Sequence, residues 1–387
     1  MQYLIKLCRA FLHGENIFID ENCDFDRLYA EAHAHNLSAV VYCVLNTAPN
    51  RDKVPQEALR RFENDFLEAV VRYDFQSRQI AEIGALCEKA GIRYVFFKGA
   101  MLRDLFPVPE ARAMGDVDIL IDHDSRNSFK NLLCENGFVC EASNGNVYEY
   151  MKDKLLCEAH TRIISGKIGE NDLESAFADA IEYAAFEGCR GTLDDNYHFA
   201  YLMAHTAHHF WFYGAGVKLI LDLAVMLKKC DIDIDKVFEI LDGAGLRQFG
   251  EVILTVTHKW FGCGRDFGAD TQKTEEFILS YGAFGNSGRN KAAVVMRKDI
   301  ENGGSGGSLG AKLRLLFPSY EKMRNIPYIS FIEGRRYLVP AAWVYRIYYN
   351  YKNRRAFVHS ATAALSSDET KQEAQQELHF FKEIGLL

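Results

Sequence analysis

One stretch of the chain, residues 94–122, constrains the fold more than any other. It reads YVFFKGAMLRDLFPVPEARAMGDVDILID. The apolar run at 94–97 is too short for a helix and is rich in aromatic residues and Val, so it predicts a buried strand. Residues 116–121 predict a second strand, and Pro107 and Pro109 limit any helix between the two strands to one or two turns. We therefore expect the chain to build a small sheet around these strands.

The flanking segments predict helices and further strands of this sheet, followed by a mainly helical region. Apolar residues recur every three or four positions over 54–90, which predicts one long helix or two shorter ones. A helix is expected over 125–135, and strands over 138–142, 147–151 and 154–161. Beyond 168 the pattern is almost wholly helical, with helices expected at 172–185, 194–212, 217–229, 235–243, 247–261, 273–284, 338–352 and 369–384.

The predicted class is therefore α+β, a small mixed sheet flanked by helices and followed by a mainly helical domain. Residues 1–84 are expected to form N-terminal helices packed on a catalytic unit at 85–165, with the helical domain at 166–387. A Gly/Ser-rich segment at 302–309 is expected to be a flexible loop within that helical domain.

Composition narrows the classes of partner. The 387 residues carry 45 Lys and Arg against 53 Asp and Glu, a net charge of −8, so nucleic acid is not favoured and an anionic membrane is not expected. No run approaches the roughly 18 apolar residues of a spanning helix. The ten cysteines form no CxxC pair, and the first residues have too short an apolar core for a signal peptide, so a reducing cytoplasm is expected.

The candidate chemistry lies in the same constraining stretch. Asp116 and Asp118 are two apart on a predicted strand, so both carboxylates project from one face and can share a divalent metal. Gly115 allows a substrate to approach the backbone closely, and Lys98 and Gly99 lie where a strand turns into a helix, a favourable place for phosphate. This combination suggests a nucleoside triphosphate bound with Mg²⁺, which prefers one or two carboxylates plus phosphate oxygens.

A third carboxylate would complete such a site. Glu158 is the best candidate, because it lies on a predicted strand with His160 two residues on and on the same face. Either residue could serve as the base. Arg112 could clamp phosphate with its planar guanidinium, or it could pair structurally with Glu110 or Asp116.

These residues carry a resemblance to a known family. The segment from Lys98 to Asp122 is similar to the signature of an uncharacterised bacterial nucleotidyltransferase family within the DNA-polymerase-β-like superfamily. That family shows Lys-Gly at the strand-helix turn, an Arg-x-Met-Gly-Asp-x-Asp core, and a later strand with an acid followed by His. The matching positions here are Lys98, Gly99, Arg112, Met114, Gly115, Asp116, Asp118, Glu158 and His160.

The resemblance implies a minimal nucleotidyltransferase sheet, with Mg²⁺ or Mn²⁺ held by Asp116, Asp118 and Glu158, and transfer of NMP from an NTP. The implied acceptor is a hydroxyl of a small molecule, a sugar or a protein. It covers most of residues 30–230. Two departures from the superfamily affect how the triphosphate is held: Lys-Gly replaces the usual Gly-Ser, and 16 residues separate Gly99 from Asp116.

Two other segments have plainer interpretations. His205, His208 and His209 share a predicted helix and could bind a metal, but we expect packing residues, with His205 and His209 on a polar wall of the nucleotide cleft and Asp222 as a hydrogen-bond partner. The aromatic and basic stretch 343–357 could bind RNA or a membrane surface, but its apolar positions 344, 347, 348 and 351 favour a plain amphipathic helix.

Two function classes besides the transferase therefore stay open. One is a non-catalytic antitoxin-like or scaffold protein that keeps the fold and binds a partner. The other is an RNA-binding or RNA-modifying protein centred on 343–357. The NTP chosen, the acceptor and the oligomeric state are not fixed by the sequence.

Overall fold

A computed structural model describes the chain except residues 145, 283–290, 302–315, 324–325, 333 and 354–366. The predicted loop at 302–309 lies outside the described residues. The chain divides into two compact units, one formed by Met1–Arg289 with Ile384–Leu387 and the other by Asn290–Glu383. The finer boundaries at 84 and 165 stay predictions.

The first unit contains the sheet that the sequence predicts, with seven strands in the described residues. Their order across the sheet is β3-β4-β5-β2-β1-β9-β8. The strands are β1 (Tyr94–Phe96), β2 (Val117–Ile121), β3 (Val139–Asn144), β4 (Val147–Lys152), β5 (Leu155–His160), β8 (Ala184–Glu187) and β9 (Arg190–Leu193). The sheet is mixed, because β2 is antiparallel to β1 and parallel to β5. The α+β class is thus confirmed.

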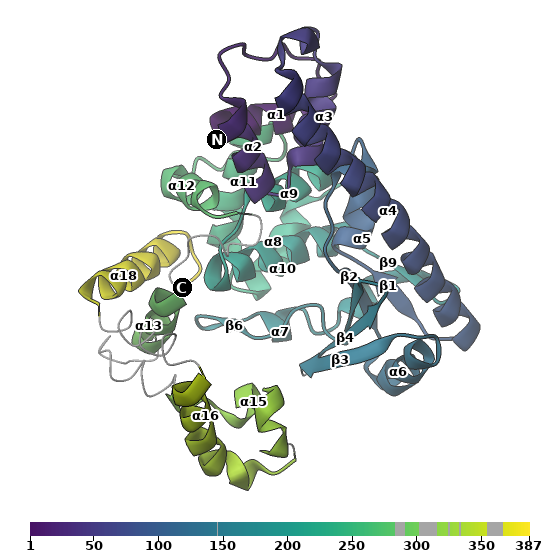
Figure 1. Ribbon diagram of the computed structural model, residues 1–387, viewed down its shortest axis with the longest axis vertical. Helices are drawn as coiled ribbons and strands as arrows, with labels where there is room; N and C mark the ends of the chain where they lie inside the picture. The colour runs from purple at the N-terminus through teal and green to yellow at the C-terminus, as the bar shows by residue number, and fades with distance from the viewer. Residues whose placement is uncertain (145, 283–290, 302–315, 324–325, 333, 354–366) are drawn as a thin grey trace. The chain divides into compact units, whose positions relative to one another are not determined.

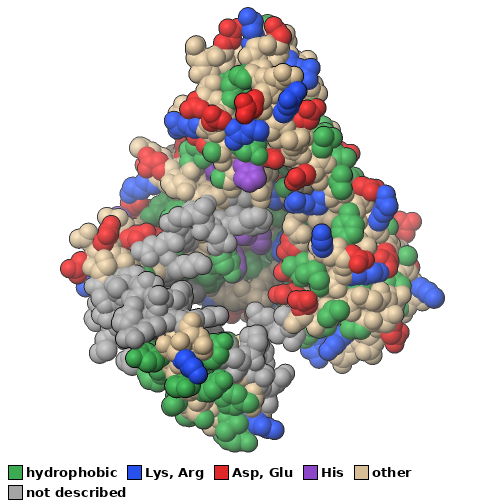
Figure 2. All heavy atoms as spheres, in the orientation of Figure 1, with side chains coloured by type: hydrophobic (Ala, Val, Ile, Leu, Met, Phe, Trp, Pro, Cys, Tyr) green, Lys and Arg blue, Asp and Glu red, His purple; other side chains and the backbone are tan. Residues whose placement is uncertain are grey.

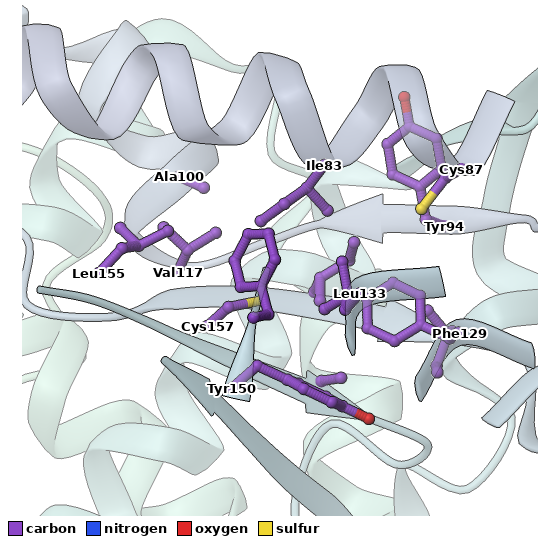
Figure 3. Close-up of a cluster of buried hydrophobic side chains, with 14 of the residues drawn as sticks. Ile83, Cys87, Tyr94, Ala100, Val117, Phe129, Leu133, Tyr150, Leu155 and Cys157 are labelled. Atoms are coloured by element: carbon purple, nitrogen blue, oxygen red, sulfur yellow. The ribbon is translucent and has the colours of Figure 1, made fainter. Parts of the chain in front are cut away.

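A long helix covers the sheet. The predicted 54–90 segment is one helix, α4 (Gln56–Ala90), which ends where Gly91 takes the left-handed conformation at φ 67°. Its side chains Ile83 and Cys87 join Val117 and Cys157 in a buried cluster between helix and strands (Figure 3). This packing holds one face of β2 against the helix. The side chains that alternate with the packed ones therefore project from the opposite face of the strand.

The prediction for residues 172–185 is wrong. In place of one helix, the chain forms β7 (Asn171–Asp172) paired with β6 (Lys167–Ile168), the short α7 (Leu173–Ala176), a 3₁₀ turn at Ala180–Tyr183 and the hairpin β8–β9. The hairpin joins the main sheet, where β9 runs parallel to β1. Local apolar spacing does not reveal this pairing, because the partner strand lies about ninety residues earlier in the chain.

The remaining helices of the first unit are shown in Figure 1; those for which the sequence predicts a span, α6 and α8 to α11, agree closely with it, whereas α12 ends earlier than predicted. They are α1 (Gln2–His13), α2 (Phe25–Ala34), α3 (Ser38–Thr47), α5 (Gly99–Leu102), α6 (Arg126–Glu135), α8 (Asp195–Phe212), α9 (Val217–Lys229), α10 (Ile234–Gly243), α11 (Arg247–Phe261) and α12 (Gln272–Ser280). None of the described helices combines the length and apolar character needed to cross a membrane.

The second unit contains α13 (Lys291–Glu301), α15 (Tyr320–Met323), α16 (Val339–Asn353) and α18 (Asp368–Glu383). The predicted helix near 338–352 is confirmed as α16, but its expected buried stripe is not: Val344 is 69% exposed, and residues 347, 348 and 351 are exposed as well. Periodicity identifies an apolar stripe without showing what covers it. Ala342 is buried instead.

Candidate active site

Two neighbouring strands bring the predicted acids together. Strands β2 and β5 run in parallel with Asp118 opposite Glu158 and Leu120 opposite His160. One ligand atom from each of Asp118, Glu158 and His160 lies within 4.8 Å of the others. Side chains at matched positions of adjacent strands share a face, which is why the predicted grouping of Glu158 and His160 with Asp118 occurs.

Hydrogen bonds and charge order this group. His160 Nε2 donates to Asp118 Oδ1 at 2.9 Å and lies 3.5 Å from Glu158 Oε2. Burial disfavours a charged imidazole, but the bonds to Asp118 and Glu158 prevail and raise the pKa of His160 above its usual value. Burial likewise opposes the Asp118 carboxylate, yet Lys98 and His160 hold the pKa of Asp118 below its usual range.

Asp116 precedes β2 and lies outside this closest group. Burial and then the charge of Asp118 raise the pKa of Asp116, and Glu158 acts in the same direction. The neighbouring carboxylates Asp118 and Glu158 therefore disfavour ionisation of Asp116.

Lys98 contacts the group through both its side chain and its backbone. Its Nζ lies 2.7 Å from Asp118 Oδ1. Although burial opposes the ammonium, the charge of Asp118 raises the pKa of Lys98 above its usual value. The backbone of Lys98 has φ 48° and ψ −122°, which is rare for a residue other than glycine.

Sequence reasoning missed the residue that accepts a hydrogen bond from this strained amide. The Lys98 N–H donates to Nε2 of His198, on α8, at 3.2 Å. Burial, followed by the charges of Arg112 and Lys98, lowers the pKa of His198 to about 4. The imidazole is therefore neutral near pH 7, as an acceptor at Nε2 must be.

A cavity of about 200 Å³ opens beside these residues. Lys98, Asp116 and Asp118 line one side, and residues of α8 and α9 line the other, among them His205, His209 and Lys218. Figure 2 shows histidine side chains, in purple, on the visible face of the first unit. His205 and His209 both line this cavity, and their role as a wall of a nucleotide cleft stays a prediction.

The two histidines of this wall are neutral. Burial first, and then neighbouring cationic groups, lowers the pKa of His209 to about 3 and that of His205 well below its usual value. Their rings meet edge to face with centroids 4.6 Å apart. The expected partner is wrong, because Asp222 is instead bound to Arg112.

The Arg112–Asp222 pair was missed by the sequence analysis. Arg112 Nε and Nη2 donate to the two carboxylate oxygens of Asp222 at 2.8 and 2.9 Å, and Nη1 donates to the Gly99 carbonyl at 3.3 Å. Both side chains are buried. The sequence predicts that the planar guanidinium of Arg112 clamps phosphate or pairs with Glu110 or Asp116. In the structure the guanidinium instead ties the segment before β2 to α9.

The two glycines of the motif have different surroundings. A Cβ on Gly99 would lie 2.8 Å from Met114 Cγ and 2.9 Å from its Sδ, so close packing requires glycine there. A Cβ on Gly115 would meet nothing within 4 Å, which leaves open space beside Asp116. The expected helix after Lys98 is only the four residues of α5, too short to give the predicted favourable place for phosphate at a helix terminus.

Lys218, at the start of α9, is a further residue that sequence reasoning missed. It lines the cavity and has no hydrogen bond or ion pair within the described part of the chain. Burial, followed by the charge of Arg112, lowers the pKa of Lys218 to about 8. No local sequence signal places this lysine beside the acids, because α9 lies far from them along the chain.

The seven-stranded sheet and its flanking helices define an α+β protein in which acids gather beside a cavity. The sequence matches the profile of a family described as uncharacterised nucleotidyltransferase over residues 21–262. The chain belongs to this family, and the general chemistry of such a family is that of a transferase. No curated protein and no solved structure gave a match.

Proposed function

We propose that the chain moves an NMP from an NTP to an acceptor hydroxyl of a small molecule, a sugar or a protein, with release of pyrophosphate. The observation that carries this proposal is the meeting of Asp118, Glu158 and His160 on adjacent strands beside a cavity with a lysine on each side. Transfer of a phosphate group depends on positioning the reactants and neutralising the phosphate charge more than on covalent chemistry by the protein. This site is suited to positioning and to charge neutralisation.

The acids fit a divalent metal. Asp118 and Glu158 present carboxylate oxygens, which Mg²⁺ and Mn²⁺ prefer, and Asp116 adds a third carboxylate nearby. Oδ1 of Asp118 accepts from Lys98 and His160, while its Oδ2 has no hydrogen bond to any described residue. When bound, the metal would neutralise charge on phosphate oxygens.

The chain's own residues have separate tasks in this proposal. Lys98 and Lys218, which both line the cavity, neutralise phosphate, and Gly115 leaves the backbone beside Asp116 uncovered. Glu158 or His160 accepts the proton of the acceptor hydroxyl. Arg112 is proposed to position the Gly99 backbone through its bond to that carbonyl, since its fork is held by Asp222.

The compartment is part of the same proposal. All ten cysteines are free thiols, including the buried Cys8 and Cys157. Free thiols persist in a reducing environment. We therefore propose that the protein acts in the cytoplasm.

The proposal is tested by measuring pyrophosphate released from each NTP with and without Mg²⁺ or Mn²⁺. We expect release to need metal, and Asp118→Asn to lower the rate at least about a hundredfold, because a lost metal carboxylate costs on the order of 3 kcal/mol in the transition state. Asp122→Asn is the matched control, an acid just beyond the other end of β2 that pairs with Arg93. It should keep the rate within about twofold.

A metal-independent rate, or equal losses in Asp118→Asn and Asp122→Asn, would contradict the assignment. Circular dichroism of each variant shows whether the fold is kept. Because transfer requires an acceptor hydroxyl, the assay is run with water alone and with a pool of sugars and polyols.

One observation favours the non-catalytic alternative. The Lys98 ammonium lies against Asp118, where a metal would otherwise balance the charge. A scaffold protein that never binds metal would keep this ion pair. Calorimetric titration with Mn²⁺ separates the two functions, since a scaffold of this kind takes up no ion while the transferase does.

A further inference from the structure

A second cavity, of about 140 Å³, lies between α3, α4 and the turn at Pro109–Ala111. It is distinct from the cavity of the proposed active site, although Arg112 and Met114 line both. Its wall includes Arg103, Ser38 and Asn36. Nothing in the proposed transfer reaction uses these three residues.

Arg103 is a buried cation without a hydrogen-bonded partner in the part of the chain that the structure describes. The residue is 5% exposed, and Nε and Nη1 are buried with no acceptor among the described residues. Asp104 Oδ1 is 3.9 Å from Nε, too far for a hydrogen bond. The Tyr73 ring lies 4.5 Å from the guanidinium carbon and covers one face. A guanidinium in this position requires an acceptor to offset its burial.

A second group at the same cavity also lacks a partner. Ser38 begins α3, and its buried Oγ has no hydrogen bond among the described residues. No side chain caps α3, and its first intrahelical bond runs from the Val41 N–H to the Leu37 carbonyl. The preceding amides of the helix are therefore available to an acceptor. Ten residues give α3 a positive end that favours negative charge.

The charges around the cavity limit what can bind. Arg72 and His33 line it as well, and so do the acids Asp65, Glu68 and Glu110. Asp65 is engaged by the Tyr29 hydroxyl and by His33 Nδ1. The remaining two acids oppose a highly charged ligand such as a triphosphate, so a second NTP does not suit the cavity.

We propose that this cavity binds a small molecule through one carboxylate or phosphate group, held by the guanidinium of Arg103, the Ser38 hydroxyl and the amides at the start of α3. The ligand would rest against the opposite side of the Arg112–Met114 segment from the proposed nucleotide cavity. Gln76 braces this segment, because its Nε2 donates to the Met114 carbonyl at 3.0 Å. The bound group is thus placed to act as an effector of the neighbouring site.

The test uses the full chain without NTP or metal, so it is independent of the proposed function. Thermal unfolding is followed while inorganic phosphate or sodium acetate is titrated at constant ionic strength set with NaCl. We expect a saturable rise in Tm with at least one of the two anions, and the comparison tells phosphate from carboxylate. Arg103→Met should abolish the rise and should melt no lower than wild type in NaCl alone, because it removes an uncompensated buried charge.

Lys218→Met controls for anion binding at the nucleotide cavity and should keep the rise. Ser38→Ala should weaken the response, and it supplies the comparison if Arg103→Met does not fold. The proposal is overturned by a wild-type Tm that neither anion raises, by a response that survives in Arg103→Met, by one that Ser38→Ala leaves unchanged, or by one that Lys218→Met removes.

Discussion

At the scale of single residues, the strained backbone of Lys98 joins the sheet to the helices. A conformation this rare costs on the order of 1–3 kcal/mol, so it persists only where neighbours enforce it. Three contacts do so here. The amide donates to His198, the carbonyl accepts from the Leu102 amide at 2.8 Å, and Nζ bonds Asp118. The lysine is held at the site before any ligand arrives.

The lowered pKa of Lys218 predicts how the affinity for NTP depends on pH. Its lowered pKa of about 8 means that the free protein loses this positive charge as the pH rises through 8. Bound triphosphate would favour the ammonium, so the affinity for NTP should fall by up to about tenfold per pH unit above 8. Titrating a fluorescent NTP analogue between pH 7 and 9.5 measures this.

The matched variant for this measurement is Lys218→Arg, which keeps its charge over the whole range. It should bind NTP with little change between pH 8 and 9.5. An equal fall in affinity for wild type and Lys218→Arg would place the titrating group elsewhere.

The candidate site was only partly accessible from sequence, and the reason is physical. Asp116, Asp118, Glu158 and His160 could be grouped because side chains alternate along strands with period two. His198, Lys218 and Asp222 could not, because they come from helices whose packing on the sheet has no local signal. Arg112 is an example. Its planar guanidinium suits phosphate, but in the structure it is paired with the buried carboxylate of Asp222 on α9.

At the scale of elements, the β8–β9 hairpin completes the sheet beside β1. Val95 pairs with Gly191 across the parallel β1–β9 ladder, and Phe186 faces Gly191 within the hairpin. A Cβ on Gly191 would lie 2.7 Å from Val95 Cγ2 and 2.8 Å from Phe186 Cε1. Glycine is therefore what allows the hairpin to lie this close to β1.

Gly191→Ala should accordingly destabilise the protein by about 1–3 kcal/mol, the usual cost of forcing a methyl group into a packed interior. Urea unfolding at pH 7.5, followed by far-UV circular dichroism, gives the change. Gly243→Ala is the control: Gly243 ends α10, and a Cβ there meets nothing within 4 Å. It should be neutral or slightly stabilising.

If the two alanine variants unfold at the same urea concentration, the close approach of β9 to β1 is wrong. The failure of sequence reasoning over 172–185 has the same origin as this prediction. Short strands such as the four residues of β9 are stabilised by their partner strand rather than by local preference, so they are the elements that periodicity identifies least well. Over 54–90, by contrast, the repeated apolar spacing predicts helix, as one long segment or two shorter ones, and the structure forms the single long α4 of about ten turns.

At the scale of the whole first unit, buried neutral histidines connect distant parts of the chain. His35, which follows α2, accepts a hydrogen bond at Nδ1 from the amide of Val217, the first residue of α9, at 3.2 Å. His198 does the same for Lys98. Each contact joins segments more than ninety residues apart, and each requires an uncharged ring nitrogen.

These contacts predict a specific loss of stability in acid. Burial lowers the pKa of His35 to about 4 from an ordinary value of 6.5, so between these values the unfolded chain binds a proton that the folded chain excludes. The free energy of unfolding should therefore fall as the pH drops from 6.5 to 4, by about 1.4 kcal/mol per unit and roughly 3 kcal/mol in all for this one group. His35→Gln can still accept a hydrogen bond from the Val217 amide through its carbonyl oxygen, but it cannot titrate. The stability of this variant should therefore depend less steeply on pH across this window.

The measurement is urea unfolding at half-unit steps of pH. The control is His123→Gln, which replaces an exposed imidazole and is expected to keep the wild-type slope. A slope that is the same in all three proteins would mean that His35 is not the buried neutral acceptor joining α2 to α9.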